Sequence, residues 1–475
     1  MTNGSKLGNL PVSMFFNSET FLWFLLAFTL LYYLVRKSLS QRNLLILGAS
    51  YLFYGWWDWR FLFLLLGSSL VDYYIGLRVK ETKDPGSRKN LVAISLLVNL
   101  GALGIFKYLD FFIGSFQTVL QTVGVQTNLP LLEIILPVGI SFYTFQSLSY
   151  TLDVYRNKVE PTKDIVAFLA YVSFFPQLVA GPIERASNLL PQFLSERKIT
   201  RMGFESGLWL VIWGMFKKVV LADNFGLLSD MIYGPHAVDG AIVVLATIAF
   251  GMQIYCDFSG YSDIARGLAS MMGFHLMVNF NLPYFATSPS DFWRRWHISL
   301  STWFRDYLYI PLGGNRGNAG SIMRNLLITM LVAGLWHGAG WNFVLWGLWH
   351  GVMLCLFQAT ALDKKIPSVV GWFLTMVVVF YGWLMFRAQS LDHIFQLTSN
   401  IFVLNFPVWI GSYVLNLAVF TLPLLAMQVW QYRTQTIYPM LPHRTWLKAG
   451  LMSICIFLIT VFWNPAGSPF IYFQF

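Results

Sequence analysis

The sequence predicts an all-α protein that crosses a membrane many times, and two observations carry the prediction. Of the 475 residues 56% are hydrophobic and only 11% are charged, whereas about a quarter of the residues in a soluble domain are charged. The apolar residues also gather in runs of about 20, the length that an α-helix needs to cross a bilayer. Candidate crossings lie near residues 16–35, 43–57, 61–79, 91–109, 131–153, 206–222, 241–257, 325–340, 341–360, 368–387, 410–430 and 449–464.

The basic residues set the expected orientation of these crossings. The net charge is +10, but Lys and Arg fall in short clusters between apolar runs, which favours anionic headgroups over nucleic acid as their partner. Clusters follow the first, third and fifth runs, namely Arg36, Lys37 and Arg42, then Arg78, Lys80, Lys83, Arg88 and Lys89, then Arg156, Lys158 and Lys163. We expect all three in the cytoplasm and the N-terminus outside, provided that residues 111–127 lie along the outer interface. The first run lacks a basic start and a cleavage site, which predicts a retained span.

The apolar stretch 165–183 differs from the other runs because Pro176, Gly181 and Pro182 interrupt it. Basic residues flank it on both sides, which favours a re-entrant segment over a crossing. Non-helical backbone at such depth is tolerated only where protein or a water-filled cavity covers it. We therefore expect a cavity near this segment.

Between about 258 and 325 the hydrophobicity falls and polar residues gather among aromatic ones. Apolar residues from Phe292 to Tyr307 recur every three or four positions, which predicts an amphipathic helix that ends before Pro311-Leu312-Gly313-Gly314. Such a helix commonly lies in the interface with its arginines toward headgroups. A lipid-surface anchor does not explain why His297 and Asp306 lie in the same segment.

His297 and His337 are the candidate catalytic residues. Imidazole titrates near neutrality, so it can take a proton from a hydroxyl that attacks an acyl group and return it to the leaving group. Each histidine alone could also be structural, and this alternative is stronger for His297 than for His337. No Cys or carboxylate stands at ligand spacing beside either one, so no metal site is expected. His350 is interpreted as structural, since it would lie roughly 20 Å beyond His337 on an unbroken helix.

The three cysteines, Cys256, Cys355 and Cys455, are widely spaced in apolar surroundings. We interpret them as core packing, because an odd number at this spacing indicates neither a disulfide framework nor a metal knuckle.

Several motifs resemble the membrane-bound O-acyltransferase family, and within it the bacterial alginate O-acetyltransferase branch. The longest is Phe292-Trp293-Arg294-Arg295-Trp296-His297-Ile298-Ser299-Leu300-Ser301-Thr302-Trp303, which Arg305-Asp306-Tyr307 and Pro311-Leu312-Gly313-Gly314 follow. The others begin at Leu136-Pro137-Val138-Gly139, Phe175-Pro176-Gln177, Gly214-Met215-Phe216-Lys217-Lys218, Asp257-Phe258-Ser259-Gly260, Trp336-His337-Gly338 and Phe386-Arg387-Ala388. They extend from about residue 45 to about residue 390.

The resemblance implies a ring-like helical bundle with re-entrant segments and a central tunnel, in which a cytoplasmic acyl thioester meets an acceptor from the other side. It implies one integral membrane domain over residues 1–475, with 11–12 spans, a catalytic core at about 130–360 and extra C-terminal spans at about 368–464. It also matches His337 to the family's near-invariant histidine and His297 to its second polar position. The expected location is the bacterial inner membrane.

The expected roles of the site candidates combine this resemblance with general chemistry. His337 would act as general base and His297 as orienting or oxyanion partner, with Trp336 or Asn342 as a further oxyanion donor. Arg294 and Arg295 are candidates for substrate or donor binding. Lys217 and Lys218 could anchor a span at the interface or attract the phosphates of coenzyme A. Asp257 and Asp263, on either side of an expected turn at Gly260, could line the tunnel or bind helix-end amides.

The sequence indicates the identity of the acyl group and of the acceptor less directly than it indicates the family. The D-alanine exporter of teichoic acid synthesis shares the histidine segments, but the two extra apolar runs and the end Pro469-Phe470-Ile471-Tyr472-Phe473-Gln474-Phe475 favour the polysaccharide-acetylating branch. No bound cofactor is expected, and acetyl-coenzyme A is the expected donor substrate. Alginate, cellulose and peptidoglycan are all possible acceptors, reached through an extracytoplasmic esterase-like partner. A transporter of glycan or lipid, or a scaffold without transfer activity, stays an alternative.

Overall fold

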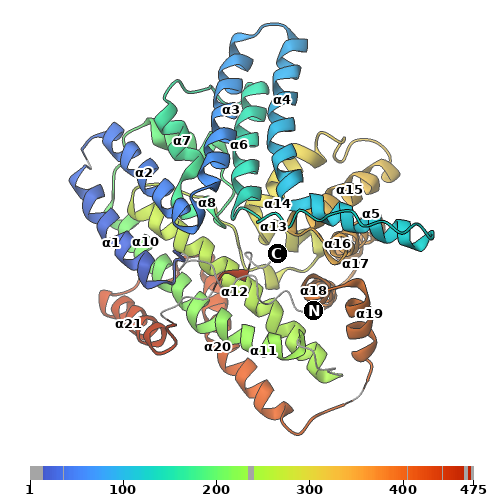
Figure 1. Ribbon diagram of the computed structural model, residues 1–475. Helices are drawn as coiled ribbons and strands as arrows, with labels where there is room; N and C mark the ends of the chain where they lie inside the picture. Colours follow the sequence, from blue (N-terminus) through green and yellow to red (C-terminus); the bar gives the residue numbers. More distant parts are fainter. Residues whose placement is uncertain are drawn as a thin grey trace. The chain divides into compact units, whose positions relative to one another are not determined.

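The computed structural model describes residues 14–35, 37–233, 240–403, 405–440, 442–464 and 469–471. All regular structure in these ranges is helical (Figure 1), so the predicted fold class is confirmed. Arg36 of the first basic cluster and residues 472–475 of the predicted C-terminal motif lie outside the described residues.

In chain order the helices are α1 (Glu19–Leu34), α2 (Leu39–Asp58), α3 (Phe61–Glu81), α4 (Pro85–Leu103), the π-helix η2 (Gly104–Tyr108), α5 (Leu109–Thr122), α6 (Ile140–Tyr155), α7 (Ile165–Ser173), α8 (Phe175–Leu178), α9 (Ala186–Leu194), α10 (Arg201–Met215), the π-helix η3 (Phe216–Ala222), α11 (Asp223–Tyr233), α12 (Ala241–Met271), the 3-10 helix η4 (Pro283–Phe285), α13 (Pro289–Arg295), α14 (Ile298–Phe304), the π-helix η5 (Arg305–Tyr309), α15 (Ala319–His337), α16 (Trp341–Thr360), α17 (Leu362–Lys365), α18 (Ser368–Arg387), α19 (Leu391–Asn400), α20 (Ile410–Thr434) and α21 (Thr445–Val461).

Seven helical stretches of the described chain are long and apolar enough to cross a membrane. They are Phe61–Glu81, Pro85–Thr122, Ala241–Met271, Ala319–His337, Trp341–Thr360, Ser368–Arg387 and Ile410–Thr434, and α1 and α21 are shorter apolar helices. Each overlaps a predicted crossing, and the total of 11–12 spans stays a prediction.

The predicted crossing at 131–153 begins too early. Residues 131–137 are not helical, and α6 starts only after Gly139, whose φ of 75° is left-handed. A proline before this glycine and the absent side chain favour a turn over a continued helix. A Cβ at Gly139 would lie 2.8 Å from the backbone oxygen of Leu178, so α6 begins in close contact with the end of α8.

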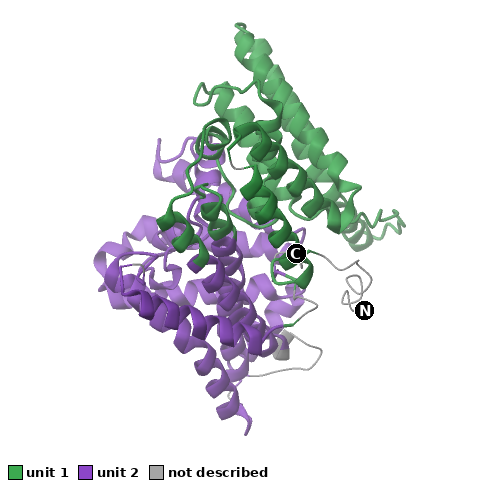
Figure 2. Cartoon of the chain, turned by 90° about the vertical axis from the view of Figure 1, so that its left-hand side faces the viewer, with its two compact units in different colours: residues 1–208, 265–276, 464–469 green, residues 209–264, 277–463, 470–475 purple. Residues whose placement is uncertain are grey.

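The chain groups into two compact units (Figure 2). Unit 1 holds residues 1–208, 265–276 and 464–469, and unit 2 holds residues 209–264, 277–463 and 470–475. Helices α10 and α12 each contribute residues to both units. The single-domain organisation expected from the resemblance stays a prediction.

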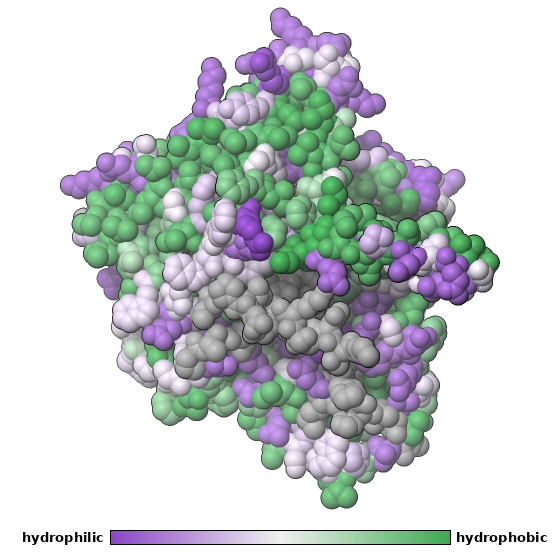
Figure 3. Space-filling model, in the orientation of Figure 1, coloured by the Kyte–Doolittle hydropathy of each residue, from purple (hydrophilic) through white to green (hydrophobic). Residues whose placement is uncertain are grey.

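In unit 1, α3, α4 and α6 form a bundle whose basic clusters lie at one end. Lys80 forms a 2.6 Å ion pair with Glu160, and the Arg88 guanidinium donates to the backbone oxygen of Tyr155 at 2.8 Å. Figure 3 shows polar residues at the tip of this bundle and apolar residues along the helices below it. The second and third basic clusters therefore share one side, as the charge pattern predicts.

Two stretches of unit 1 that were expected to depart from plain crossings are bent or broken, and their interfacial and re-entrant positions in a membrane stay predictions. In Figure 1, α5 turns away from the axis of α4 after η2, as a helix lying along the interface would; its depth in a membrane stays a prediction. The stretch 165–183 is broken into α7 and α8, and residues 167–186 are all buried. Protein therefore covers this irregular backbone, and the cavity expected near it stays a prediction.

In unit 2, α10 and α12 cross at glycines. A Cβ at Gly214 would lie 2.6 Å from the backbone oxygen of Gly260, and one at Gly260 would lie 2.9 Å from that of Gly214. Small residues let two helix backbones approach closely inside a membrane. The expected turn at Gly260 is wrong, because this residue lies within the continuous helix α12.

Candidate active site

Unit 2 holds both candidate catalytic histidines. The amphipathic helix predicted over residues 292–307 is interrupted: α13 ends at Arg295, α14 begins at Ile298, and His297 between them has a left-handed φ of 42°. A left-handed conformation is uncommon for a residue other than glycine and needs support from its surroundings. The prediction of one continuous helix is therefore wrong at His297, a candidate catalytic residue. The turn at residues 310–315 does end the helical stretch, after η5.

The support for His297 comes from Asn279, which precedes α13 in the chain. The Asn279 backbone oxygen accepts from the Ile298 amide at 2.9 Å. Its side-chain oxygen accepts from the Ser299 amide at 3.2 Å and from the Ser299 hydroxyl at 2.7 Å. Its amide nitrogen donates to the Ser262 hydroxyl at 3.1 Å. Asn279 thus binds the first two residues of α14 and links them to α12.

His337 is the last residue of α15, at a tight turn into α16. The turn and the close packing of α15 against α16 depend on glycines. A Cβ at Gly338 would collide with the Phe343 ring, and one at Gly334 would collide with the Phe343 backbone oxygen. The ring centroids of His297 and His337 lie 6.5 Å apart. Two residues 40 positions apart therefore meet in one buried place, with 0% and 5% of their surface exposed.

Aromatic rings surround the two histidines. The His297 ring lies 4.5 Å from that of Phe258 and 5.9 Å from that of Trp336. His337 lies 5.0 Å from Trp346 and 5.3 Å from Phe386, both edge to face. Burial, and then the neighbouring His337, hold the pKa of His297 well below its ordinary value of 6.5. His297 is therefore a neutral imidazole at physiological pH.

His350 is not placed as the sequence suggests. Residues 338–340 interrupt the helix between α15 and α16, so the 20 Å separation along one helix is wrong. Trp346 contacts both histidines, with ring centroids 5.0 Å from His337 and 4.8 Å from His350. His350 and the candidate base therefore contact the same indole ring.

Asn342 holds the start of α16 against the end of α18. Its side-chain nitrogen donates to the backbone oxygens of Ala388 at 3.0 Å and Phe386 at 3.4 Å. These contacts engage the donor that an oxyanion would need. Of the two donors named from the sequence, Trp336 lies beside both histidines.

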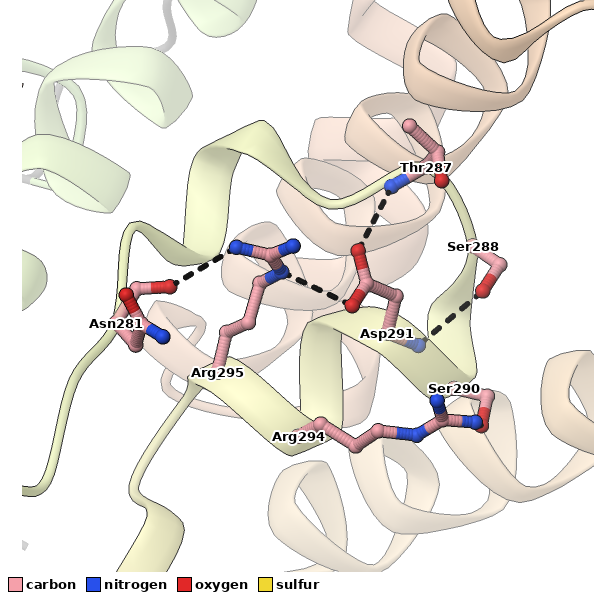
Figure 4. A network of polar contacts seen from close by, with 7 residues as sticks. All are labelled: Asn281, Thr287, Ser288, Ser290, Asp291, Arg294 and Arg295. Carbon is pink, nitrogen blue, oxygen red and sulfur yellow. Dashed lines mark hydrogen bonds and ion pairs between the residues drawn. The ribbon is translucent and has the colours of Figure 1, made fainter. Parts of the chain in front are cut away.

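Arg294 and Arg295 lie on α13 but make different contacts (Figure 4). Arg295 pairs with Asp291 at 2.9 Å and donates to the backbone oxygen of Asn281 at 3.4 Å. Arg294 is exposed and donates to the Ser290 hydroxyl at 3.2 Å. Arg295 thus braces the segment that carries Asn279, while Arg294 is the more accessible cation. A binding role for either stays a prediction.

Lys217 and Lys218 are buried within unit 2 and face carboxylates. Lys217 pairs with Asp263 at 2.7 Å, and Lys218 pairs with Asp257 at 2.7 Å and with Asp223 at 2.9 Å. At 3% and 2% exposure both lysine side chains lie inside the protein, paired with carboxylates. Anchoring a span at the interface and binding the phosphates of coenzyme A both stay predictions. Asp257 also accepts from the Ile471 amide at 2.6 Å, so the C-terminal segment joins this network.

Nothing in the sequence indicated a contact between Asn279, Ser262 and Ser299. Asn279 was visible in the sequence as a polar residue in an aromatic stretch, but its contacts join three segments that are distant along the chain.

The described residues contain no group of three or more His, Cys, Asp or Glu that could hold a metal ion. Cys256 and Cys455 are buried and Cys355 is partly exposed, all as free thiols.

Known proteins resemble this chain over most of its length. The model of the membrane-bound O-acyltransferase family matches residues 161–398, which include every site candidate from Lys217 to Asn342. The probable alginate O-acetylase of Azotobacter vinelandii is 42% identical over 393 residues, covering 82% of this chain and 78% of that protein. The peptidoglycan O-acetyltransferase of Helicobacter pylori is 33% identical over 428 residues, covering 82% and 80%.

A teichoic acid D-alanyltransferase of Streptococcus thermophilus is 30% identical over 244 residues, which cover 48% of this chain and 58% of that protein. The alginate O-acetylase match is both closer and longer. This chain is therefore a multi-pass membrane O-acyltransferase that belongs to the membrane-bound O-acyltransferase family, in its alginate O-acetylase-like branch.

Proposed function

We propose that this enzyme moves an acetyl group from cytoplasmic acetyl-coenzyme A to hydroxyl groups of an extracytoplasmic polysaccharide. The observation that carries the proposal is the buried pair His297 and His337, which meet at the ends of two interrupted helices. The relatives named for alginate and peptidoglycan O-acetylation support acetyl over D-alanyl transfer. The final acceptor is a polysaccharide such as alginate or peptidoglycan, and the enzyme lies in the inner membrane of a bacterium.

In the proposed reaction His337 is the general base. The acceptor hydroxyl oxygen bonds to the acyl carbon, its proton passes to the His337 imidazole, and the carbonyl electron pair moves onto the oxygen. When the carbonyl re-forms, the carbon–sulfur bond breaks and the departing thiolate takes the proton back from His337. General base catalysis of this kind contributes about 10²–10⁴-fold. His297, buried and neutral, orients His337 or hydrogen-bonds the reacting groups.

The immediate acceptor in this proposal is a hydroxyl of an extracytoplasmic esterase-like partner protein, which then passes the acetyl group to the polysaccharide. A membrane enzyme with a buried base can acylate a small protein hydroxyl that enters from the outer side. The polysaccharide itself need not enter the membrane.

The test is consumption of labelled acetyl-coenzyme A by the purified protein, with label followed on protein and glycan. We expect turnover by the wild type and loss of about 10²–10⁴-fold in His337→Ala. His275→Ala is the matched control, because His275 is exposed and only its backbone forms hydrogen bonds. Full turnover by a folded His337→Ala protein would refute the assignment of the base. No turnover by the folded wild type, with or without added partner, would favour a D-alanyl donor or a transporter.

A further inference from the structure

Three aromatic rings contact one another beside His337. Trp293 comes from α13, and Trp346 and His350 come from α16. Their ring centroids are separated by 5.2 Å for Trp293 and His350, 4.8 Å for Trp346 and His350, and 5.7 Å for Trp293 and Trp346. Trp346 also contacts His337. The cluster is therefore in contact with the candidate base.

Each of these three rings carries a buried nitrogen without a hydrogen-bond partner. The atoms are Trp293 Nε1, Trp346 Nε1 and His350 Nδ1. Folded proteins pair most buried polar atoms, so each exception needs an explanation. The two indole nitrogens, on rings in mutual contact, have a common explanation if a ligand oxygen accepts from both N–H groups.

Gly382 of α18 packs directly against the same rings. A Cβ at this position would lie 2.6 Å from His350 Nε2 and 3.4 Å from Trp346 Nε1. Any larger residue would therefore collide with His350 and press against Trp346. Only a residue without a side chain lets α18 lie this close to both rings.

We propose that Trp293, Trp346 and His350 form a subsite that binds the carbonyl oxygen of the transferred acyl group. This inference rests on the proposed function. Indole N–H groups donate without carrying charge, which suits a thioester oxygen that is neutral when bound and gains negative charge during attack. Fixed donors in a water-excluded site stabilise such charge strongly. The subsite supplies the donors that Asn342, bound to backbone oxygens, does not.

The first experiment removes each N–H and keeps an aromatic ring. Trp293→Phe and Trp346→Phe are expected to lower kcat about 10–10³-fold in the acetyl-coenzyme A assay, with circular dichroism and elution volume unchanged. The matched control is Trp349→Phe, since Trp349 lies on the same helix but its Nε1 donates to the Val378 backbone oxygen at 2.9 Å. We expect this control to keep its kcat even if its melting temperature falls. Gly382→Ala, whose added methyl group would displace the His350 ring, should also lower kcat.

A second readout does not depend on turnover. Acetyl-coenzyme A labelled with ¹³C at the carbonyl is bound to the His337→Ala protein, and its carbonyl stretch is measured by isotope-edited infrared spectroscopy. A hydrogen-bonded carbonyl absorbs at lower wavenumber, so we expect a downshift that disappears in His337→Ala with Trp346→Phe and persists with Trp349→Phe.

The outcomes separate this subsite from the proposed function. If the wild type consumes acetyl-coenzyme A and both subsite variants keep full kcat and an unchanged carbonyl band, the subsite is refuted and the function stands. If the folded wild type neither binds nor consumes acetyl-coenzyme A, the function and the subsite are both overturned.

Discussion

At the scale of single residues, His297 shows how burial decides the protonation state of a site. Its ring is fully buried among Phe258, Trp336 and His337, and its pKa is well below 6.5. An unfolded chain would take up a proton near pH 6.5, whereas the folded protein does not. The unfolded state then binds more protons, so the free energy of unfolding falls as the pH drops below about 6.5, by at most about 1.4 kcal/mol per pH unit.

We therefore expect acid to destabilise the wild type more than His297→Gln. The measurement is the apparent melting temperature in detergent between about pH 7.5 and pH 5, compared as slopes rather than as absolute values. His275→Gln, at an exposed histidine, should follow the wild type. Parallel slopes for wild type and His297→Gln would show that His297 is not held neutral.

Asn279 is the residue whose role was hidden in the sequence. Asn279→Ala removes the acceptor of two Ser299 donors and the link to Ser262, leaving buried polar groups unpaired at a cost of about 1–3 kcal/mol each. We expect a lower melting temperature and a lower kcat, because His297 loses the support of its left-handed backbone. Asn281→Ala is the control, since Asn281 contributes backbone groups to its contacts with Arg295. Equal activity of the two variants would contradict a positioning role for Asn279.

The two catalytic candidates could be named from the sequence, because each stands in a short motif of unusual composition. Asn279 could not, because its partners Ser262 and Ser299 lie 17 and 20 positions away and their meeting depends on tertiary structure. Trp293, Trp346 and His350 were visible as residues, but only the ring contacts show that they form one cluster.

At the scale of helices, the apolar periodicity of the sequence predicted which side chains are buried. It did not predict where a helix is interrupted. The apolar pattern from Phe292 to Tyr307 is real, and Phe292, Trp296, Leu300, Trp303 and Phe304 are all buried. The break at His297 leaves this pattern intact, because α13 and α14 each keep their apolar face inward. What interrupts the helix is the set of hydrogen bonds to Asn279, which no local pattern records.

The ion pairs between η3 and α12 give an element-scale prediction. Lys218→Met leaves the buried carboxylate of Asp257 without its lysine, and breaking a buried pair in this way costs about 3–5 kcal/mol. We expect a large fall in melting temperature, partly restored in the double variant Lys218→Met with Asp257→Leu, and little change in the KM for acetyl-coenzyme A. Lys365→Met, at an exposed lysine, should change neither quantity.

The opposite result would favour the other role considered for Lys218. A KM that rises several-fold while the melting temperature stays constant would indicate that this lysine binds the phosphates of the donor. The sequence left both roles open, because the carboxylate partners at positions 257 and 263 are about 40 residues away from the lysine pair.

At the scale of the whole molecule, the charge pattern predicted which loops share a side. Lys80 with Glu160 and Arg88 with Tyr155 bring the second and third basic clusters to one end of the α3, α4 and α6 bundle. Since α4 and α6 run in opposite directions, the loop before α6 lies at the other end. The positive-inside rule predicts that the basic end lies in the cytoplasm. It also predicts an N-terminus outside, on the expectation that α1, α2 and α3 each cross the membrane.

We expect this orientation to appear in cysteine labelling of the two loops. In a Cys355→Ser background, which removes the partly exposed thiol, a membrane-impermeant maleimide should label Gln126→Cys in spheroplasts and should label Lys83→Cys only after permeabilisation. Both positions are exposed and lie in loops, so access to the reagent depends on the side of the membrane and not on burial. The reverse pattern would invert the orientation and move the basic end outside.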